Sequence, residues 1–231
     1  ERADDAAALL QVGAAVERAG VAAQLEGEDP CTCMSWSDVY SQHPIFCGQG
    51  QEFAWTGIGH KAGIIYGDQF CKYFYQILSD NVCVNLNYGD DSPEQWCYVS
   101  HQCESLNGGG DVGSLRWKRC DPGHDRMLVK MAPEEVQRIA EEQDMDAGFL
   151  MHMAYPMADK GSQPEWSVAR ECLTNASVSD KCKEVKRTQD AGMPMFYDST
   201  NNLPPYGVII GQTAYESHFT AAFVEAMIKG G

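Results

Sequence analysis

Hydrophobic and polar positions change their period several times along this chain. In residues 68–79 the apolar side chains recur every three to four positions, which predicts an amphipathic helix with one cysteine on its buried face. Residues 82–86 alternate between apolar and polar, residues 95–99 read as a second strand, and the Gly- and Pro-containing segment 89–93 between them is typical of a turn. We therefore predict a hairpin, followed by a third short strand at 115–120.

The second half of the chain shows mainly helical patterns. A Pro-Glu-Glu opening at 133–135 suits the first turn of a helix, and a second helical stretch follows at 147–155. The next region is rich in Pro, Ser and Asn, so we expect irregular structure up to a short apolar strand at 208–210. Thr213 and Glu216 form a capping-box pattern, which predicts a final helix with one face made of Tyr215, Phe219, Ala222, Phe223, Ala226 and Met227.

The chain opens with a further helical pattern at residues 3–25. Asp4 and Asp5 favour a helix N-terminus, and small apolar residues then recur, including Leu9, Val12 and Val16. Docking of this helix against a partner and a place on the protein's own surface both remain open. Together the patterns predict an α+β fold in three regions: an N-terminal helix and linker at 1–30, a small disulfide-stapled domain with short antiparallel strands at 31–130, and a mainly helical region at 131–231.

The cysteine pattern is the most informative feature of the sequence for predicting how the fold is stabilised. Ten cysteines occur in 231 residues, and eight of them fall in one stretch, at Cys31, Cys33, Cys47, Cys71, Cys83, Cys97, Cys103 and Cys120. No C-x2-C or H-x3-5-H spacing accompanies them, so a disulfide framework in an oxidising compartment is favoured over zinc, and no cofactor is expected. Cys31 and Cys33 should reach different partners, and the isolated Cys172 and Cys182 should bond each other, giving the last region one local disulfide.

The net charge of −16 argues against nucleic acid as a partner and disfavours an anionic membrane surface. No apolar run approaches the roughly 18 residues that would span a bilayer, so no membrane span is expected. The opening residues lack the positive segment of a signal peptide, and we interpret Glu1 as a mature terminus left after a targeting segment was removed.

Catalytic motifs are missing from the sequence, which predicts a protein that is not an enzyme. A cysteine nucleophile beside His60 or His101 would need a free thiol, and the even count argues against one. The Met151-His152-Met153 run offers soft copper ligands but is more typical of core packing. Asn175 begins an N-glycosylation pattern, and the five tryptophans are expected in the core rather than on a sugar-stacking surface.

Three segments resemble the cysteine-rich extracytoplasmic proteins of dinoflagellates. They are Cys-Thr-Cys-Met-Ser-Trp-Ser-Asp-Val-Tyr at 31–40, Trp-Cys-Tyr-Val-Ser at 96–100 and Ser-Leu-Asn-Gly-Gly-Gly at 105–110, within a resemblance that covers residues 30–156. Similar proteins occur in plastid-bearing cells. The resemblance implies a thylakoid-lumen protein with photosystem I and its light-harvesting antenna proteins as partners.

We therefore expect a non-catalytic docking subunit on the lumenal face of a photosynthetic membrane complex, where it stabilises subunit association. A secreted glycan- or peptide-binding module is the alternative. The expected partner-contact residues lie on the terminal helices, at Leu9, Val12, Val16, Phe219 and Phe223. If the N-terminal helix is not an anchor, the loops around Trp55 and Asn107 are the next place to look.

Overall fold

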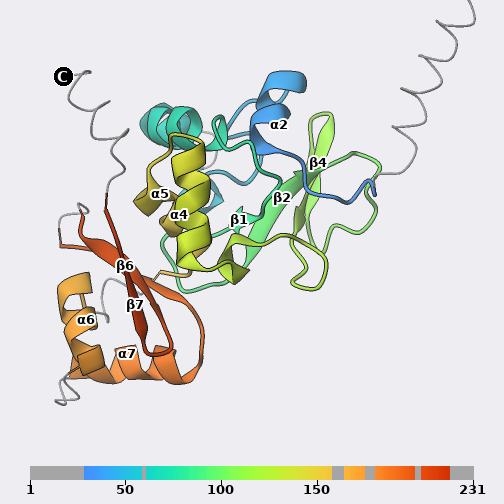
Figure 1. Ribbon diagram of the computed structural model, residues 1–231. Coiled ribbons are helices and arrows are strands. Elements are labelled where there is room, and N and C mark those ends of the chain that lie inside the picture. The colour runs from blue at the N-terminus through green and yellow to red at the C-terminus, as the bar shows by residue number, and fades with distance from the viewer. Residues whose placement is uncertain (1–28, 59–60, 158–163, 175–179, 201–203, 219–231) are drawn as a thin grey trace, which may run out of the picture.

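Two small antiparallel sheets with helices packed on them form the part of the chain that the computed structural model describes, namely residues 29–58, 61–157, 164–174, 180–200 and 204–218 (Figure 1). The predicted α+β class is confirmed. Residues 29–157 are called the cysteine-rich body below, and residues 164–218 the C-terminal unit. The N-terminal helix predicted at 3–25 and the glycosylation pattern at Asn175 lie outside the described residues.

The cysteine-rich body begins with four helical segments: α2 (Trp36–Gln42), the 3-10 turn η1 (Ala54–Thr56), α3 (Ala62–Gly67) and the π-helix η3 (Asp68–Tyr75). α2 starts after Ser35, whose hydroxyl accepts the Asp38 backbone N–H at 3.4 Å as an N-cap. α3 runs directly into η3, so the helix predicted from residue 68 begins earlier, at Ala62.

The first sheet has the order β1-β2-β4-β3, with β1 (Val84–Asn85), β2 (Gln95–Val99), β3 (Gly110–Val112) and β4 (Leu115–Arg119). The predicted hairpin is β1–β2, which pairs Val84 with Trp96. All five residues of β2 are buried, so this central strand forms the middle of the core. Around it, Trp36 is fully buried with its ring centroid 4.8 Å from that of Trp96, and its indole N–H donates to the Val82 carbonyl at 2.8 Å.

Three further segments complete the body: η4 (Leu128–Lys130), α4 (Pro133–Glu142) and α5 (Ala147–Ala154). α4 carries Pro133 at its start and buries Val136 and Ile139, as its sequence pattern predicted. α4 and α5 belong to the same hydrophobic cluster as β2 and α2. Packing therefore places them in the cysteine-rich body, although the sequence pattern assigned them to the region after residue 130.

The C-terminal unit contains α6 (Trp166–Thr174), α7 (Asp180–Asp190) and a sheet of order β5-β6-β7, with β5 (Met195–Tyr197), β6 (Tyr206–Ile210) and β7 (Thr213–Ser217). Figure 1 shows this sheet between α6 and α7 on one side and the body on the other. Phe196 and Val208 pack into the core of the body, whereas their neighbours Met195 and Ile209 pack with Trp166. This alternation is the two-residue period of a strand that is buried on both faces.

Two predictions for the last third of the chain are wrong. The region expected to be irregular contains α6 and α7. Thr213–Ser217, expected to open a helix, instead forms strand β7, which pairs with β6 across a two-residue turn at Gly211, where φ is +55°. The edge of β6 offers hydrogen-bond partners to the backbone N–H and C=O groups of these residues. These hydrogen bonds stabilise the strand more than the capping box would stabilise a helix. Phe219 and Phe223 lie outside the described residues.

All ten cysteines are paired, as Cys31–Cys103, Cys33–Cys97, Cys47–Cys71, Cys83–Cys120 and Cys172–Cys182. Cys31 and Cys33 reach different partners, as the sequence indicated. Within the described residues, no helix has the length and apolar character needed to cross a bilayer. The disulfides fit an extracytoplasmic, oxidising compartment.

Replacing Cys172 and Cys182 together by serine is expected to lower the free energy of unfolding of the C-terminal unit by about 3 kcal/mol, because the bond closes a loop of ten residues in the unfolded chain. Urea titration followed by limited proteolysis measures this. Cleavage should rise within residues 164–218 and not in the body. An unchanged unfolding midpoint would show that packing of Trp166 and Val185 alone holds α6 and α7 together.

Candidate functional site

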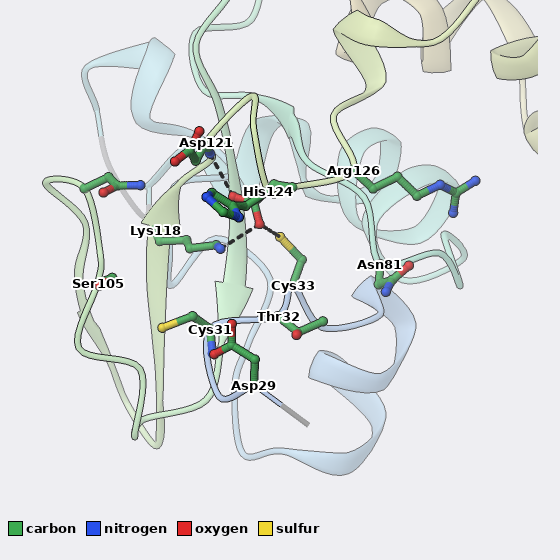
Figure 2. A pocket seen from close by; sticks show the side chains of 12 residues that line it. Asp29, Cys31, Thr32, Cys33, Asn81, Ser105, Lys118, Asp121, His124 and Arg126 are labelled. Atoms are coloured by element: carbon green, nitrogen blue, oxygen red, sulfur yellow. Dashed lines mark hydrogen bonds and ion pairs between the residues drawn. The ribbon is translucent and has the colours of Figure 1, made fainter. Parts of the chain in front are cut away.

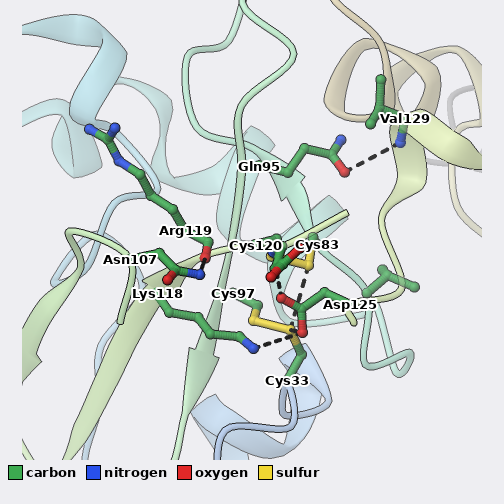
Figure 3. The surroundings of a disulfide bond; sticks show 12 residues. Cys33, Cys83, Gln95, Cys97, Asn107, Lys118, Arg119, Cys120, Asp125 and Val129 are labelled. Atoms are coloured by element: carbon green, nitrogen blue, oxygen red, sulfur yellow. Dashed lines mark hydrogen bonds and ion pairs between the residues drawn. A yellow bond between two sulfur atoms is a disulfide. The ribbon is translucent and has the colours of Figure 1, made fainter. Parts of the chain in front are cut away.

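Four sulfur atoms from two disulfides form one cluster in the cysteine-rich body (Figure 3). The sulfurs of Cys33, Cys83, Cys97 and Cys120 all lie within 4.8 Å of one another, and the non-bonded Cys33 and Cys83 sulfurs are 3.5 Å apart. Three of these residues are buried and Cys120 is half-buried. The two bonds therefore pack against each other as a single unit.

Backbone hydrogen bonds hold all four cysteine segments in place independently of the sulfur bonds. The Cys83 N–H donates to the Arg126 carbonyl at 2.9 Å, and the Cys120 N–H donates to the Gln95 carbonyl at 2.8 Å. Cys97 lies within β2, and beside Cys33 the Met34 N–H donates to the Tyr98 carbonyl at 2.9 Å. The cluster is therefore a product of the sheet and its adjoining loops.

A buried ion pair lies next to the sulfurs. Lys118 on β4 and Asp125 approach to 2.7 Å, and their side chains are only 7% and 6% exposed. The second carboxylate oxygen of Asp125 accepts the Asp121 backbone N–H at 2.7 Å. Asp125 also approaches the Cys33 sulfur at 3.9 Å, which is a packing contact because a disulfide sulfur carries no proton.

Beside this pair the surface forms a cavity of about 580 Å³. Its lining is polar and carries both signs of charge, as Figure 2 shows: Asp29, Cys31, Thr32, Cys33, Asn81, Ser105, Asn107, Lys118, Asp121, His124, Asp125 and Arg126. Asn107, which the sequence marked as a possible docking loop, contributes to this rim. The cavity gives solutes a route to the Cys33 end of the sulfur cluster.

A second buried charged group is Glu52, which is fully buried between α2, β2 and the loop before η1. One carboxylate oxygen accepts the hydroxyls of Tyr40 at 2.7 Å and Tyr98 at 2.6 Å, and the other accepts the Gly50 N–H at 2.9 Å. Burial raises the pKa of Glu52 above its ordinary value, and the three hydrogen bonds oppose that shift. Burial and the nearby carboxylate also raise the pKa of Tyr98. Glu52 thus fastens its loop to the core.

The loop held by Glu52 belongs to an exposed apolar surface. Among the described residues six large hydrophobic side chains are exposed, and five of them lie between residues 46 and 73: Phe46 (79%), Ile58 (46%), Ile64 (87%), Ile65 (65%) and Tyr73 (60%). These five residues are called the apolar surface below. The sixth, Met193, is 39% exposed and lies in the C-terminal unit.

One disulfide and one packed aromatic ring join the chain segments that carry the apolar surface. The Cys47–Cys71 disulfide joins the neighbour of Phe46 to η3, with the two Cα atoms 5.9 Å apart. The Gly48 backbone and the start of α3 both pack on the Phe53 ring. A Cβ atom added to Gly48 would lie 2.9 Å from that ring, and one added to Gly63 would lie 3.8 Å from it. Residues 46–73 contain two lysines and two acidic residues, so this segment is neutral in a chain of net charge −16.

The structure places the other sequence candidates as follows. Met151 and Met153 are buried in the core, and the His152 ring packs on Phe196 with 3.9 Å between ring centroids. Trp36, Trp96 and Trp166 are fully buried, and Trp55 and Trp117 are half-buried, so the tryptophans form no exposed stacking surface. His60, Leu9, Val12 and Val16 lie outside the described residues.

Sequence reasoning missed both the apolar surface and the sulfur cluster. The adjacent Ile64 and Ile65 gave no signal for the surface, because neighbouring residues of a helix can share one buried face, as Leu150 and Met151 do in α5. The four sulfurs gave no signal, because Cys33 and Cys120 are 87 positions apart and spacing motifs detect only near neighbours. Comparison of this chain with protein-family models, with curated proteins and with solved structures found no match.

Proposed function

We propose that this protein is a non-catalytic docking subunit that binds a partner protein through the apolar surface. The observation that carries the proposal is the exposure of five large apolar side chains on one segment of the cysteine-rich body. Five exposed apolar side chains within 28 consecutive residues are a high density for a protein surface, and exposed apolar residues are enriched at protein interfaces. The segment is also covalently braced by Cys47–Cys71 and fastened by Glu52, which lowers the ordering cost of binding.

The charge distribution supports a protein partner over a lipid surface. The whole net charge of −16 lies outside residues 46–73, so the remaining surface repels an anionic membrane. A partner with an apolar, uncharged patch would complement this neutral segment. Cationic groups around the partner's patch would complement the acidic surface around the segment. Together with the disulfides, this supports a subunit that works in an oxidising compartment.

The resemblance to the dinoflagellate proteins makes the proposal more specific. On that basis we propose the thylakoid lumen as the compartment, and photosystem I with its antenna as the complex whose subunit association the protein stabilises. A secreted glycan-binding module has less support, because none of the five tryptophans is exposed enough to offer a stacking face.

A double replacement of Ile64 and Ile65 by glutamate tests the docking proposal. Each buried isoleucine contributes about 1.5–3 kcal/mol, so binding to the partner complex should fall more than tenfold. The fold should persist, because the two side chains are 87% and 65% exposed. Native size fractionation of thylakoid extracts, read by chlorophyll and by antibody against the protein, measures the bound fraction.

Met193→Glu is the control, because it introduces a glutamate at an exposed apolar residue of the C-terminal unit, with one added charge against the two of the double variant. It should leave the protein with the complex. Recovery of the Ile64/Ile65 variant in the complex at the wild-type level would overturn the use of this surface. A wild-type protein that elutes alone, near its 25.5 kDa mass, would overturn the docking function. Binding to lipid vesicles that the Ile64/Ile65 variant loses and Met193→Glu keeps would show that the apolar surface binds a membrane instead.

A further inference from the structure

The cluster of Cys33, Cys83, Cys97 and Cys120 has the composition and arrangement of a four-thiolate metal centre. We propose that, once its two disulfides are reduced, it binds one Zn²⁺ ion in a tetrahedral site. This inference is independent of the docking function, because it rests on different residues. It also differs from the sequence expectation, in which the absence of C-x2-C spacing disfavoured zinc.

The distances suit such a site. A Zn–S bond of about 2.3 Å in tetrahedral geometry places ligand sulfurs roughly 3.8 Å apart. In the structure the four sulfurs lie within 4.8 Å of one another, and the non-bonded Cys33–Cys83 separation is 3.5 Å. Opening each disulfide moves its own two sulfurs apart by somewhat under 2 Å, which side-chain rotation provides without moving the strands.

Backbone hydrogen bonds and a strand also hold the scaffold at this place. Cys97 is held in β2, and the segments of Cys83 and Cys120 are held by backbone hydrogen bonds to Arg126 and Gln95. Four ligands positioned by a sheet and its loops form a preorganised site, and structural Zn²⁺ adds its binding free energy to folding. The ion would then replace the cross-links that reduction removes.

The cavity supplies access to the site. Four thiolates and one Zn²⁺ carry a net charge of −2, and the neighbouring charged groups are Asp125, whose carboxylate lies 3.9 Å from the Cys33 sulfur, and Lys118, which pairs with Asp125 at 2.7 Å (Figure 3). Cys33, Lys118 and Asp125 also line the 580 Å³ cavity, through which a reductant and the ion can enter.

The reaction balances with an external dithiol as the reductant. Each disulfide takes two electrons and two protons from one dithiol, which is itself oxidised to a disulfide, so two dithiols yield four cysteine thiols. Zn²⁺ then displaces four protons and forms four Zn–S bonds. A two-electron oxidant acting twice reverses the sequence: it reforms both disulfides and releases the ion. The cluster thus has an oxidised, metal-free state and a reduced, zinc-bound state.

The test uses the full chain, reduced with a phosphine without oxygen, incubated with Zn²⁺ or Co²⁺ and desalted. We expect about one metal ion per reduced chain and none per oxidised chain, with a Co²⁺ absorption spectrum typical of tetrahedral four-sulfur ligation. Replacing Cys83 and Cys120 together by serine should abolish that spectrum. The control, Cys47→Ser with Cys71→Ser, removes a disulfide outside the cluster and should leave the spectrum unchanged.

A second variant guards against general unfolding of the reduced chain. In it the six other cysteines are serine, and only Cys33, Cys83, Cys97 and Cys120 remain. Adding Zn²⁺ to this reduced variant should raise its urea midpoint, and the metal-free reduced form should unfold earlier. The proposal is overturned if reduced wild-type protein binds no metal, if the Co²⁺ spectrum is not that of four sulfurs, or if the Cys83/Cys120 variant binds as much metal as the control.

Discussion

Replacing Asp125 by alanine is expected to lower the free energy of unfolding by about 3–5 kcal/mol, the cost of leaving one member of a buried ion pair without its partner. Lys118 and Asp125 are 7% and 6% exposed, so the lysine that remains can be solvated only through the cavity beside it. The same change removes the acceptor of the Asp121 backbone N–H. Chemical denaturation of the oxidised protein at neutral pH measures the loss.

A double-mutant cycle separates the ion pair from packing. Lys118→Met alone and Asp125→Leu alone each leave one buried charge without its partner, and both should be strongly destabilising. The double variant Lys118→Met with Asp125→Leu removes both charges, and it should regain most of the loss because apolar residues of similar size are tolerated in place of a buried pair. Arg138→Met is a control, since its ion pair with Glu142 is more than half exposed and should contribute less than about 1 kcal/mol. Additive effects at Lys118 and Asp125 would contradict this account.

Replacing Glu52 by leucine is expected to destabilise the protein by about 3–5 kcal/mol, because it leaves two tyrosine hydroxyls and one backbone N–H without their acceptor. Glu52 also fastens the loop that carries Phe46, so binding through the apolar surface should weaken together with stability. Urea unfolding and the native size fractionation described above provide the two measurements. Loss of stability with full binding would show that the loop keeps its conformation without Glu52.

Glutamine at position 52 has a different effect, which depends on pH. The folded-state pKa of Glu52 is raised by burial, so the folded state binds the proton more tightly than the unfolded state does. This contribution to stability is therefore present below the unfolded value of about 4.3 and is lost as pH rises through the folded pKa. Wild-type protein should therefore lose stability as pH rises through the folded pKa of Glu52, whereas Glu52→Gln should not. The difference in unfolding free energy, variant minus wild type, should increase over this pH range. A difference that stays constant from pH 4 to pH 8 would show that the three hydrogen bonds cancel the effect of burial.

Much of the cysteine-rich body follows from local sequence. The apolar period of α4, the alternation in β1 and the run in β2 identified these elements, because each must bury one face or both. The even cysteine count indicated complete pairing, and the isolated positions of Cys172 and Cys182 indicated their bond. For these elements and for the Cys172–Cys182 bond, the deciding interaction lies within about ten residues of the signal.

The tertiary structure alone decided the rest. Thr213–Ser217 is a strand because β6 presents an unpaired edge there. α7 is a helix although it buries only Val185 and Thr188, since Val185 packs in one cluster with Trp166 and the Thr188 hydroxyl bonds that of Tyr197 at 2.9 Å. The sequence does not show whether an apolar side chain is buried or exposed, so it could not predict the apolar surface. The sulfur cluster was hidden because its members meet only through strand pairing. Tertiary folding determines which residues that are distant in sequence lie close together. The burial of a side chain, the charges around it and its affinity for a metal ion all depend on those neighbours.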